Sequence, residues 1–250
     1  MSNLIRGEFY KLKKSKYLIG IIILTLLVLF LMIHSYYSNI TSMKKEHLYL
    51  VNGMDSIEFA FEWLVITSFI FSLFAGEFIA KDLKHNMNKS FIYGYKRSKV
   101  ILSKLIVFII TFLFLQLIYT TILVIHVSIN YGFCKTLNYS TILYLIRVVI
   151  IGIMYSVATM SIVSMIAIII RSNVCTAFSP ILFTLAFQAL GLKPPIPAII
   201  KCVFPVIVGR EALARFAPKS VIISAIISSI VIFTITTLIS VLYVKHKDIK

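Results

Sequence analysis

Four ionisable side chains fall within or beside the long apolar segments of this 250-residue chain: Glu58, Glu62, His126 and Arg147. Ionisable groups inside a membrane are costly and are therefore functional candidates by default. Glu58 and Glu62 are four residues apart, so they share a helix face and could serve an intramembrane enzyme or a proton-coupled process. All four, however, fall near the expected outer ends of their segments, where water is close. This position favours pairing between helices or at the lipid headgroups.

The motifs of the common enzyme classes are absent from the sequence. It contains no phosphate-binding loop of the type GxxxxGK[ST] and no Rossmann glycine fingerprint. It contains neither the HExxH of zinc proteases nor the GxSxG of serine hydrolases. Cys134, Cys175 and Cys202 lack metal-ligand spacing, although a disulfide between Cys134 and Cys202 stays open. We therefore predict a chain without catalytic residues, metal site or directly bound cofactor.

The composition excludes an ordinary soluble domain. The chain is 60% hydrophobic and only 14% charged, whereas soluble domains have about 25% charged residues. A formal charge of +16 would suggest nucleic acid in a soluble protein. Here the bases cluster beside apolar segments, where membrane topology and anionic membrane lipid explain them better than nucleic acid does. The composition thus predicts a multi-pass protein of the cell membrane.

The apolar segments predict an all-α integral membrane protein with a single transmembrane domain over residues 1–250. A helix needs about 20 mostly apolar residues to cross a bilayer. Six segments are expected to span: 17–37, 57–80, 100–127, 141–170, 174–190 and 221–244. Prolines divide residues 192–218 into apolar pieces too short to cross. This pattern is typical of re-entrant helices, expected here on the outer side before the sixth span.

The basic residues predict the orientation of the chain. With both termini in the cytoplasm, the inner segments hold sixteen Lys and Arg and the outer loops hold eight. Cytoplasmic loops carry an excess of these residues, so the asymmetry favours this orientation. Residues 1–16 form a short amphipathic pattern, with Glu8, Phe9 and Leu12 on one side, that predicts a helix on the cytoplasmic membrane surface.

The longest inner loop lies between the second and third spans. Residues 77–104 contain seven Lys and Arg, and Asp82 is the only acid after Glu77. A loop of this length and charge is the segment through which the protein is expected to receive a signal from the cytoplasm. We delimit it as residues 81–99.

The layout and three sequence features resemble the permease subunits of type-2 ABC exporters. The chain opens with LIxxEFxKLK at residues 4–13, and the second span ends in GEF at residues 76–78. The loop closes with Arg97 and, seven positions later, Lys104, which is the spacing common in the family. Where the family often has a Gly-Thr pair, this chain has His85-Asn86.

The resemblance implies partners and a site. Two permeases, as a homodimer or a homologous heterodimer, would assemble with separate ABC ATP-binding subunits that hold ATP and Mg²⁺. The loop would dock on the ATPase through a short helix over residues 85–92, together with the helix before the first span. The residues expected at this ATPase-coupling contact are Glu77, His85, Asn86, Met87, Lys89, Phe91, Ile92, Arg97 and Lys104, with Glu8, Phe9 and Leu12 on the first helix.

The resemblance also implies a translocation path between the second and fifth spans. Its candidate residues are Thr67, Ser68, Ser72, Thr176, Ser179, Thr184 and Gln188, which could equally be ordinary contacts between helices. Gly94 in the loop is more similar to permeases that expel bacitracin, lantibiotics or other membrane-active peptides, for export or self-immunity. The alternatives are a multidrug or lipid export permease, a membrane sensor or assembly factor, and an intramembrane enzyme.

Overall fold

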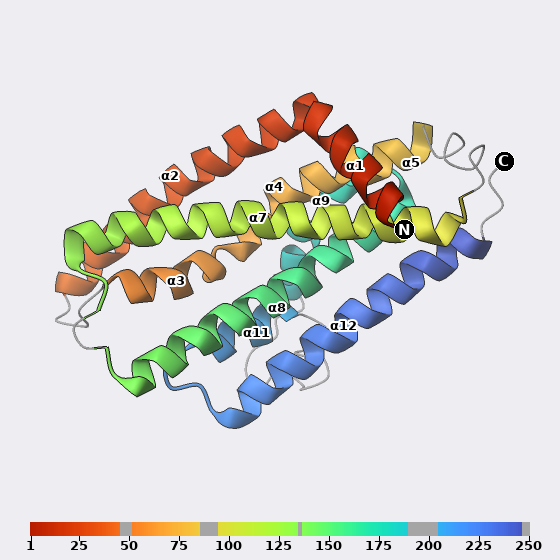
Figure 1. The fold of residues 1–250 in the computed structure, drawn as a ribbon. Coiled ribbons are helices and arrows are strands. Elements are labelled where there is room, and N and C mark those ends of the chain that lie inside the picture. Colours follow the sequence, from red (N-terminus) through yellow and green to blue (C-terminus); the bar gives the residue numbers. More distant parts are fainter. Residues whose placement is uncertain (46–51, 86–94, 135–136, 190–204, 247–250) are drawn as a thin grey trace.

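The computed structural model describes the chain except for residues 46–51, 86–94, 135–136, 190–204 and 247–250. For residues 40–45, 85 and 183–189 it describes the backbone but not the side chains. Every element in the described part is helical, and the helices run roughly along one bundle axis (Figure 1). The prediction of an all-α chain is therefore confirmed for the residues that the structure describes.

Within the part of the chain that the structure describes, five helical segments are long and apolar enough to cross a membrane. They are α2 (Lys16–Lys45), the run of α4 (Leu64–Ala75), η1 (Gly76–Lys81) and α5 (Asp82–His85), then α7 (Arg97–Tyr131), α8 (Tyr139–Ile170) and α12 (Lys219–His246). The helix α9 (Asn173–Ala189) has 17 residues, fewer than the roughly 20 that a span needs. The fifth predicted span, residues 174–190, and with it the total of six, therefore stays a prediction.

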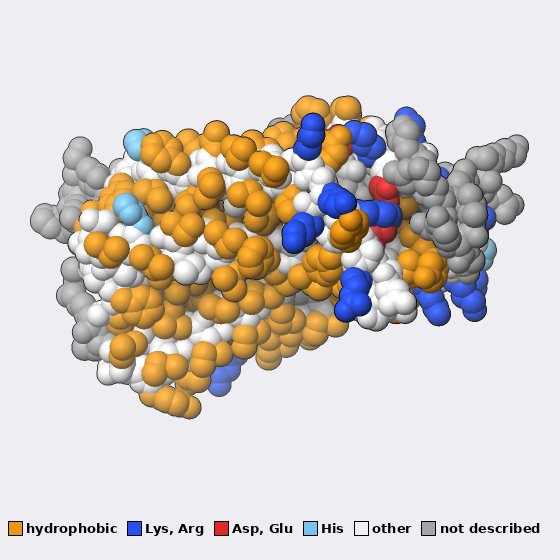
Figure 2. Space-filling view, turned by 45° about the horizontal axis from the view of Figure 1, so that its top comes forward, with side chains coloured by type: hydrophobic (Ala, Val, Ile, Leu, Met, Phe, Trp, Pro, Cys, Tyr) orange, Lys and Arg blue, Asp and Glu red, His pale blue; other side chains and the backbone are white. Residues whose placement is uncertain are grey.

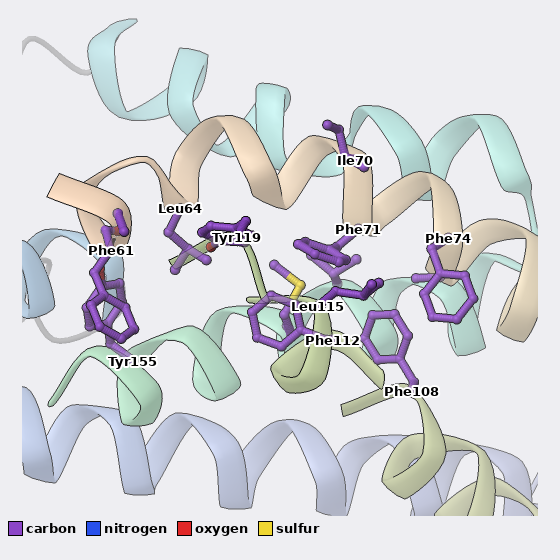
Figure 3. Close-up of a cluster of buried hydrophobic side chains, with 14 of the residues drawn as sticks. Phe61, Leu64, Ile70, Phe71, Phe74, Phe108, Phe112, Leu115, Tyr119 and Tyr155 are labelled. Carbon is purple, nitrogen blue, oxygen red and sulfur yellow. Dashed lines mark hydrogen bonds between the residues drawn. The ribbon is translucent and has the colours of Figure 1, made fainter. Parts of the chain in front are cut away.

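Aromatic side chains of α4 and α7 meet within the hydrophobic core. The rings of Phe71 and Phe112 meet edge to face with centroids 4.7 Å apart, and those of Phe74 and Phe108 stack at 5.6 Å (Figure 3). All four rings are buried. Edge-to-face and stacked aromatic pairs stabilise packing beyond the area they bury. By contrast, α2 and α12 turn many large apolar side chains outward, as helices that face lipid do.

The two ends of the bundle differ in charge. One end carries α1 (Ser2–Lys14), α5, the first turns of α7 and the last turn of α12 (Figure 1). Lys and Arg gather at this end, beyond a belt of apolar side chains (Figure 2). We call it the inner end, after the orientation that its bases predict. The first helix and the C-terminal end of α12 thus lie on the same side of the bundle.

The second span is not the continuous helix predicted over residues 57–80. The helix α3 (Gly53–Glu62) ends at Trp63, and α4 begins with Leu64. The buried Tyr155 of α8 donates its hydroxyl to the carbonyl oxygen of Phe61 at 2.5 Å, and the two rings pack edge to face (Figure 3). This bond engages a carbonyl at the end of α3 and fixes the break. The prediction was wrong here because the break depends on a distant tyrosine.

Other boundaries also differ from the prediction. The first spanning helix continues to Lys45, beyond the predicted end at residue 37. The predicted helix over residues 85–92 lies outside the described residues apart from His85, the last residue of α5. Of the outer segment 192–218, the structure describes α11 (Pro205–Leu213), whose nine residues cannot cross a membrane. Cys202 also lies outside the described residues, so its pairing stays untested.

Candidate functional site

Lys104 lies buried at the inner end, two turns into α7. Only 3% of its side chain is exposed. Its ammonium Nζ lies 2.9 Å from Oε2 of Glu8 on α1 and also contacts the carboxylate of Asp82 on α5. Glu8 is equally buried. An isolated charge in such a place would be strongly destabilising, so both groups depend on this pairing.

A fourth residue completes the cluster. Nζ of Lys11, which is half exposed, lies 3.3 Å from Oε1 of Glu8 and 4.0 Å from Oδ2 of Asp82. We call these four residues, Glu8, Lys11, Asp82 and Lys104, the inner network. Two acids face two bases, and the network joins three separate elements of the chain, α1, α5 and α7. It therefore holds both flanks of the predicted docking loop against the N-terminal helix.

The amphipathic pattern of α1 explains why Glu8 reaches Lys104. Leu12 is buried in the core and Ile5 packs against it, so this helix face turns toward α7. Glu8 lies four residues before Leu12, on the same face. Phe9 lies at the edge of this face and is 36% exposed. Of the three predicted residues on this helix, Glu8 and Leu12 are therefore buried and Phe9 is partly exposed.

A second group of contacts surrounds Glu77. Its carboxylate accepts a bond from Nδ2 of Asn173 at 2.8 Å and pairs with Nζ of Lys81 at 2.8 Å. Lys81 in turn donates to the hydroxyl of Tyr17 at 2.6 Å. Glu77 and Lys81 belong to η1, a stretch of π-helix, and such stretches occur frequently at functional sites. This group joins η1 to α9 and α2.

The close approach of η1 to α9 depends on Gly76. A Cβ atom at this position would lie 3.1 Å from both Cα and the carbonyl oxygen of Asn173. Real Cβ contacts are rarely so short, and the neighbour here is backbone that cannot turn aside. A glycine next to Glu77 therefore lets the amide of Asn173 reach the carboxylate.

The remaining predicted coupling residues surround this site or lie outside the described part. Arg97 begins α7, seven residues before Lys104. His85 is the last residue of α5, and its side chain is not among those that the structure describes. The residues Asn86, Met87, Lys89, Phe91 and Ile92 lie outside the described residues. The centre of the predicted ATPase-docking surface thus lies outside the described residues, whereas the helices on both sides of it, α5 and α7, are described.

The predicted path residues belong to α4 and α9, two helices that pack against each other. Thr67, Ser68 and Ser72 on α4 are buried, as are Thr176 and Ser179 on α9. Ser72 donates to the carbonyl oxygen of Ala177 on α9 at 2.8 Å. Small polar residues are common in such contacts between membrane helices. The other two predicted path residues, Thr184 and Gln188, lie in the part of α9 whose side chains the structure does not describe.

Glu58 and Glu62, two of the four ionisable candidates, each have a side-chain partner at the opposite, outer end. Glu58 accepts a bond from the hydroxyl of Tyr144 at 2.5 Å. Burial raises the pKa of Glu58 above its ordinary value, and the bond from Tyr144 partly opposes this rise. Glu62 pairs with Nε of Arg210 at 3.0 Å. These contacts join α3 to α8 and α11 rather than forming an isolated catalytic group.

The other two ionisable candidates, Arg147 and His126, also contact other parts of the chain at this end. Arg147 donates to the carbonyl oxygens of Ala214 and Arg215, at 2.7 and 3.2 Å, just beyond the end of α11. His126 is exposed and lies edge to face against Tyr37, with ring centroids 5.7 Å apart. Among the residues that the structure describes, no three His, Cys, Asp or Glu side chains gather as metal ligands would.

Comparison with known families supports a transport subunit among the classes that the sequence left open. Residues 4–191 match the family described as ABC-2 family transporter protein. The chain belongs to the ABC-2 transporter family. A chain of this family is a membrane transport subunit of an ABC exporter and normally pairs with an ATP-binding subunit. A comparison with curated proteins gave no match.

The ABC-2 match contains every residue of the inner network. Sequence reasoning had placed Glu8, Glu77 and Lys104 at the coupling contact, but it had not included Asp82, Asn173 or Tyr17. One signal could have pointed to Asp82, the single acid within a strongly basic loop. A lone acid in such surroundings is a natural partner for a buried lysine. No comparable signal marked Asn173, which reads as an ordinary turn residue after α8.

Proposed function

We propose that the chain docks its ATP-binding subunit through the loop between α5 and α7, and that the inner network transmits the movement of that subunit to the membrane helices. The observation that carries this proposal is the buried contact of Lys104 with Glu8 and Asp82. It ties both flanks of the loop to the N-terminal helix. Family membership supports a separate ATPase as the partner.

The contacts suggest a route for the movement. A displacement of the loop would move α5 and α7 together, because Asp82 and Lys104 contact one another. Glu77 and Asn173 would carry it to α9, and the bond from Ser72 to the carbonyl of Ala177 connects α9 to α4. Transmission of this kind requires that the moving elements have two discrete arrangements. The contact between α4 and α9 is the candidate for the element that changes.

The proposed substrate is amphipathic, and a membrane-active or antimicrobial peptide is the class that the sequence favours. The loop residue Gly94 and the buried hydroxyl groups between α4 and α9 support this choice. A second permease copy, identical or homologous, would complete the path, with ATP and Mg²⁺ held on the partner subunits. Export of drugs or lipids by the same subunit is the competing proposal.

The docking proposal is tested by co-expressing the chain with an ABC ATP-binding subunit from the same genome. We expect the two proteins to co-purify in equal amounts and ATP hydrolysis to rise on assembly. Lys104→Met should abolish most of this rise, whereas Lys99→Met, a loss of the same charge at an exposed position of α7, should leave it intact. Full stimulation in Lys104→Met would exclude the network from coupling.

The substrate proposal is tested separately in a peptide-sensitive bacterial host. Cells that express both subunits should tolerate several times more bacitracin or lantibiotic than cells whose ATPase carries an inactivating substitution. If tolerance to peptides is unchanged and efflux of a lipophilic dye rises instead, the drug-export alternative replaces the peptide proposal. The docking proposal does not depend on this outcome.

A further inference from the structure

The N-terminal helix has a second side that the inner network does not use. Glu8 is the only acid among the first 45 residues, and it is turned inward against Lys104. The side of α1 that points away from α7 consists of exposed bases and aromatic rings. We define it as the basic face of α1: Arg6, Phe9, Tyr10, Lys13 and Lys14.

The charge of this face follows from the fold rather than from composition alone. In the sequence, Glu8 partly offsets the bases of the helix. In the structure its carboxylate is buried and neutralised by Lys104 and Lys11. Among the described residues, neither Arg6 nor Lys13 has an acidic partner, and Lys14 lies over the ring of Tyr10 at 4.7 Å from its centroid. The face therefore presents positive charge only.

The position of the basic face indicates what it meets. It leads directly into α2, where Ile19, Ile23 and Phe30 are exposed in the manner of side chains that face lipid. The bases of the inner end begin where the apolar belt of the bundle stops (Figure 2). That border is the depth at which lipid headgroups lie. Tyrosine rings are enriched at this depth, and lysine and arginine extend their charged ends to it.

We propose that the basic face of α1 binds the headgroups of anionic phospholipids in the inner leaflet. The lipid phosphates would lie against Arg6, Lys13 and Lys14, and the rings of Phe9 and Tyr10 would enter the boundary between headgroups and acyl chains. An ATPase surface is the other macromolecular candidate. We favour lipid because this face adjoins the apolar belt, whereas the proposed ATPase-docking loop leaves α5 and enters α7 at the tip of the bundle.

This proposal goes beyond the proposed function and gives α1 two sides with different tasks. Glu8 and Leu12 attach it to α7, and the basic face attaches it to the membrane surface. Any movement that the inner network passes to α1 then takes place against a lipid anchor. The headgroup charge of the surrounding membrane becomes a property that the transporter senses directly.

The test uses the purified full chain in neutral detergent, without an ATPase. It is equilibrated with equal amounts of phosphatidylglycerol and phosphatidylcholine, and bound lipids are counted by native mass spectrometry. Each base near an anionic surface strengthens binding about fivefold. The triple variant Arg6→Gln, Lys13→Gln, Lys14→Gln should therefore lower the preference for phosphatidylglycerol at least about tenfold. The charge-retaining variant Lys13→Arg, Lys14→Arg should keep the preference.

The matched control removes the same charge from exposed positions of the same end, through Lys96→Gln, Lys99→Gln and Lys245→Gln. We expect this control to keep the preference within about twofold, and the unfolding temperatures of both triple variants to match that of the wild type because all six side chains are exposed. Inorganic phosphate at equal concentration should not compete.

Three results would overturn the proposal. The α1 triple variant could retain the preference for phosphatidylglycerol, both triple variants could lose it equally, or inorganic phosphate could displace the lipid. If the α1 variant keeps its lipid preference but no longer assembles with the ATPase, the face is a protein-docking surface. A failure of lipid binding alone leaves the proposed coupling through Lys104 standing.

Discussion

The inner and outer ends of the bundle hold their helices together by different means. At the inner end, the buried charges of Glu8 on α1 and Lys104 on α7 meet the partly exposed Asp82 of α5 in one network. At the outer end, the ion pair that joins α3 to α11, Glu62 with Arg210, is partly exposed, and Arg147 bonds to two backbone carbonyls just beyond α11. Apolar side chains of α11 are also buried at this end. The break at Trp63 between α3 and α4 also lies toward this end.

The ion pairs at the two ends should differ in how much they contribute to stability. Removing one member of a buried ion pair leaves an uncompensated charge and costs about 3–5 kcal/mol, whereas an exposed pair contributes about 0–1 kcal/mol. We expect elements that are joined by a buried ion pair to move together. Exposed ion pairs can separate at little cost. We infer that the ion pairs of the inner end hold their helices together more strongly than the ion pair of the outer end does.

The largest effect is expected from removing the buried lysine. Lys104→Met should lower the free energy of unfolding by about 3–5 kcal/mol, because Glu8 and Asp82 lose the base between them. Lys99→Met, exposed on the same helix, should change it by less than about 0.5 kcal/mol. Denaturant unfolding in detergent measures both. Equal effects of the two variants would remove the contrast between the ends.

A smaller loss is expected from overpacking near the outer break. A Cβ atom at Gly152 would lie 2.6 Å from the ring of Phe61, so Gly152→Ala should destabilise by about 1–3 kcal/mol. Gly20 on α2 has no atom within 4 Å of such a Cβ, and Gly20→Ala should be neutral or slightly stabilising because alanine favours helix. If Gly152→Ala is as well tolerated as Gly20→Ala, Phe61 does not pack as described.

The bond that fixes the break should have a more modest effect. Tyr155→Phe keeps the ring against Phe61 but removes the hydroxyl that donates to its carbonyl, with an expected cost of about 1 kcal/mol. Proteolysis near Trp63 should also become faster as α3 loosens. Tyr139→Phe, an exposed position on the same helix, serves as the control. Unchanged stability and proteolysis in Tyr155→Phe would show that the break has another cause.

The smallest effect is expected at the outer ion pair. Arg210 is 62% exposed and Glu62 partly so, and Glu62→Gln should therefore cost no more than about 1 kcal/mol. The equivalent change at the inner end, Glu8→Gln, should cost several times more. Measuring both by the same unfolding assay compares the two ends directly. A larger loss for Glu62→Gln would reverse the proposed difference between them.

The sequence predicted the helices better than their contacts. Long apolar runs between basic or polar segments placed α2, α7, α8 and α12 within a few residues, except for the longer end of α2, because helix existence follows from local composition. The break at Trp63 was missed, since no glycine or proline marks it and the bond from Tyr155 comes from 94 residues away.

The candidate site shows the same limit. Glu8 and Lys104 were expected in the same functional region through a family resemblance, yet nothing local indicates that they meet across 96 residues. Asp82 was noticed only as a charge. The meeting of the three depends on how α1 folds back onto α7, which is a property of packing and not of any single segment.

The central claim is that Glu8 and Lys104 act as one unit in coupling. A double-mutant cycle on ATP hydrolysis by the assembled transporter tests it, with Glu8→Gln, Lys104→Met and the double variant compared at equal assembly. Residues in direct contact show interaction energies of about 0.5–3 kcal/mol. We predict that each single variant loses most of the stimulation and that the double variant is no worse than either. Small losses that simply add would contradict the account.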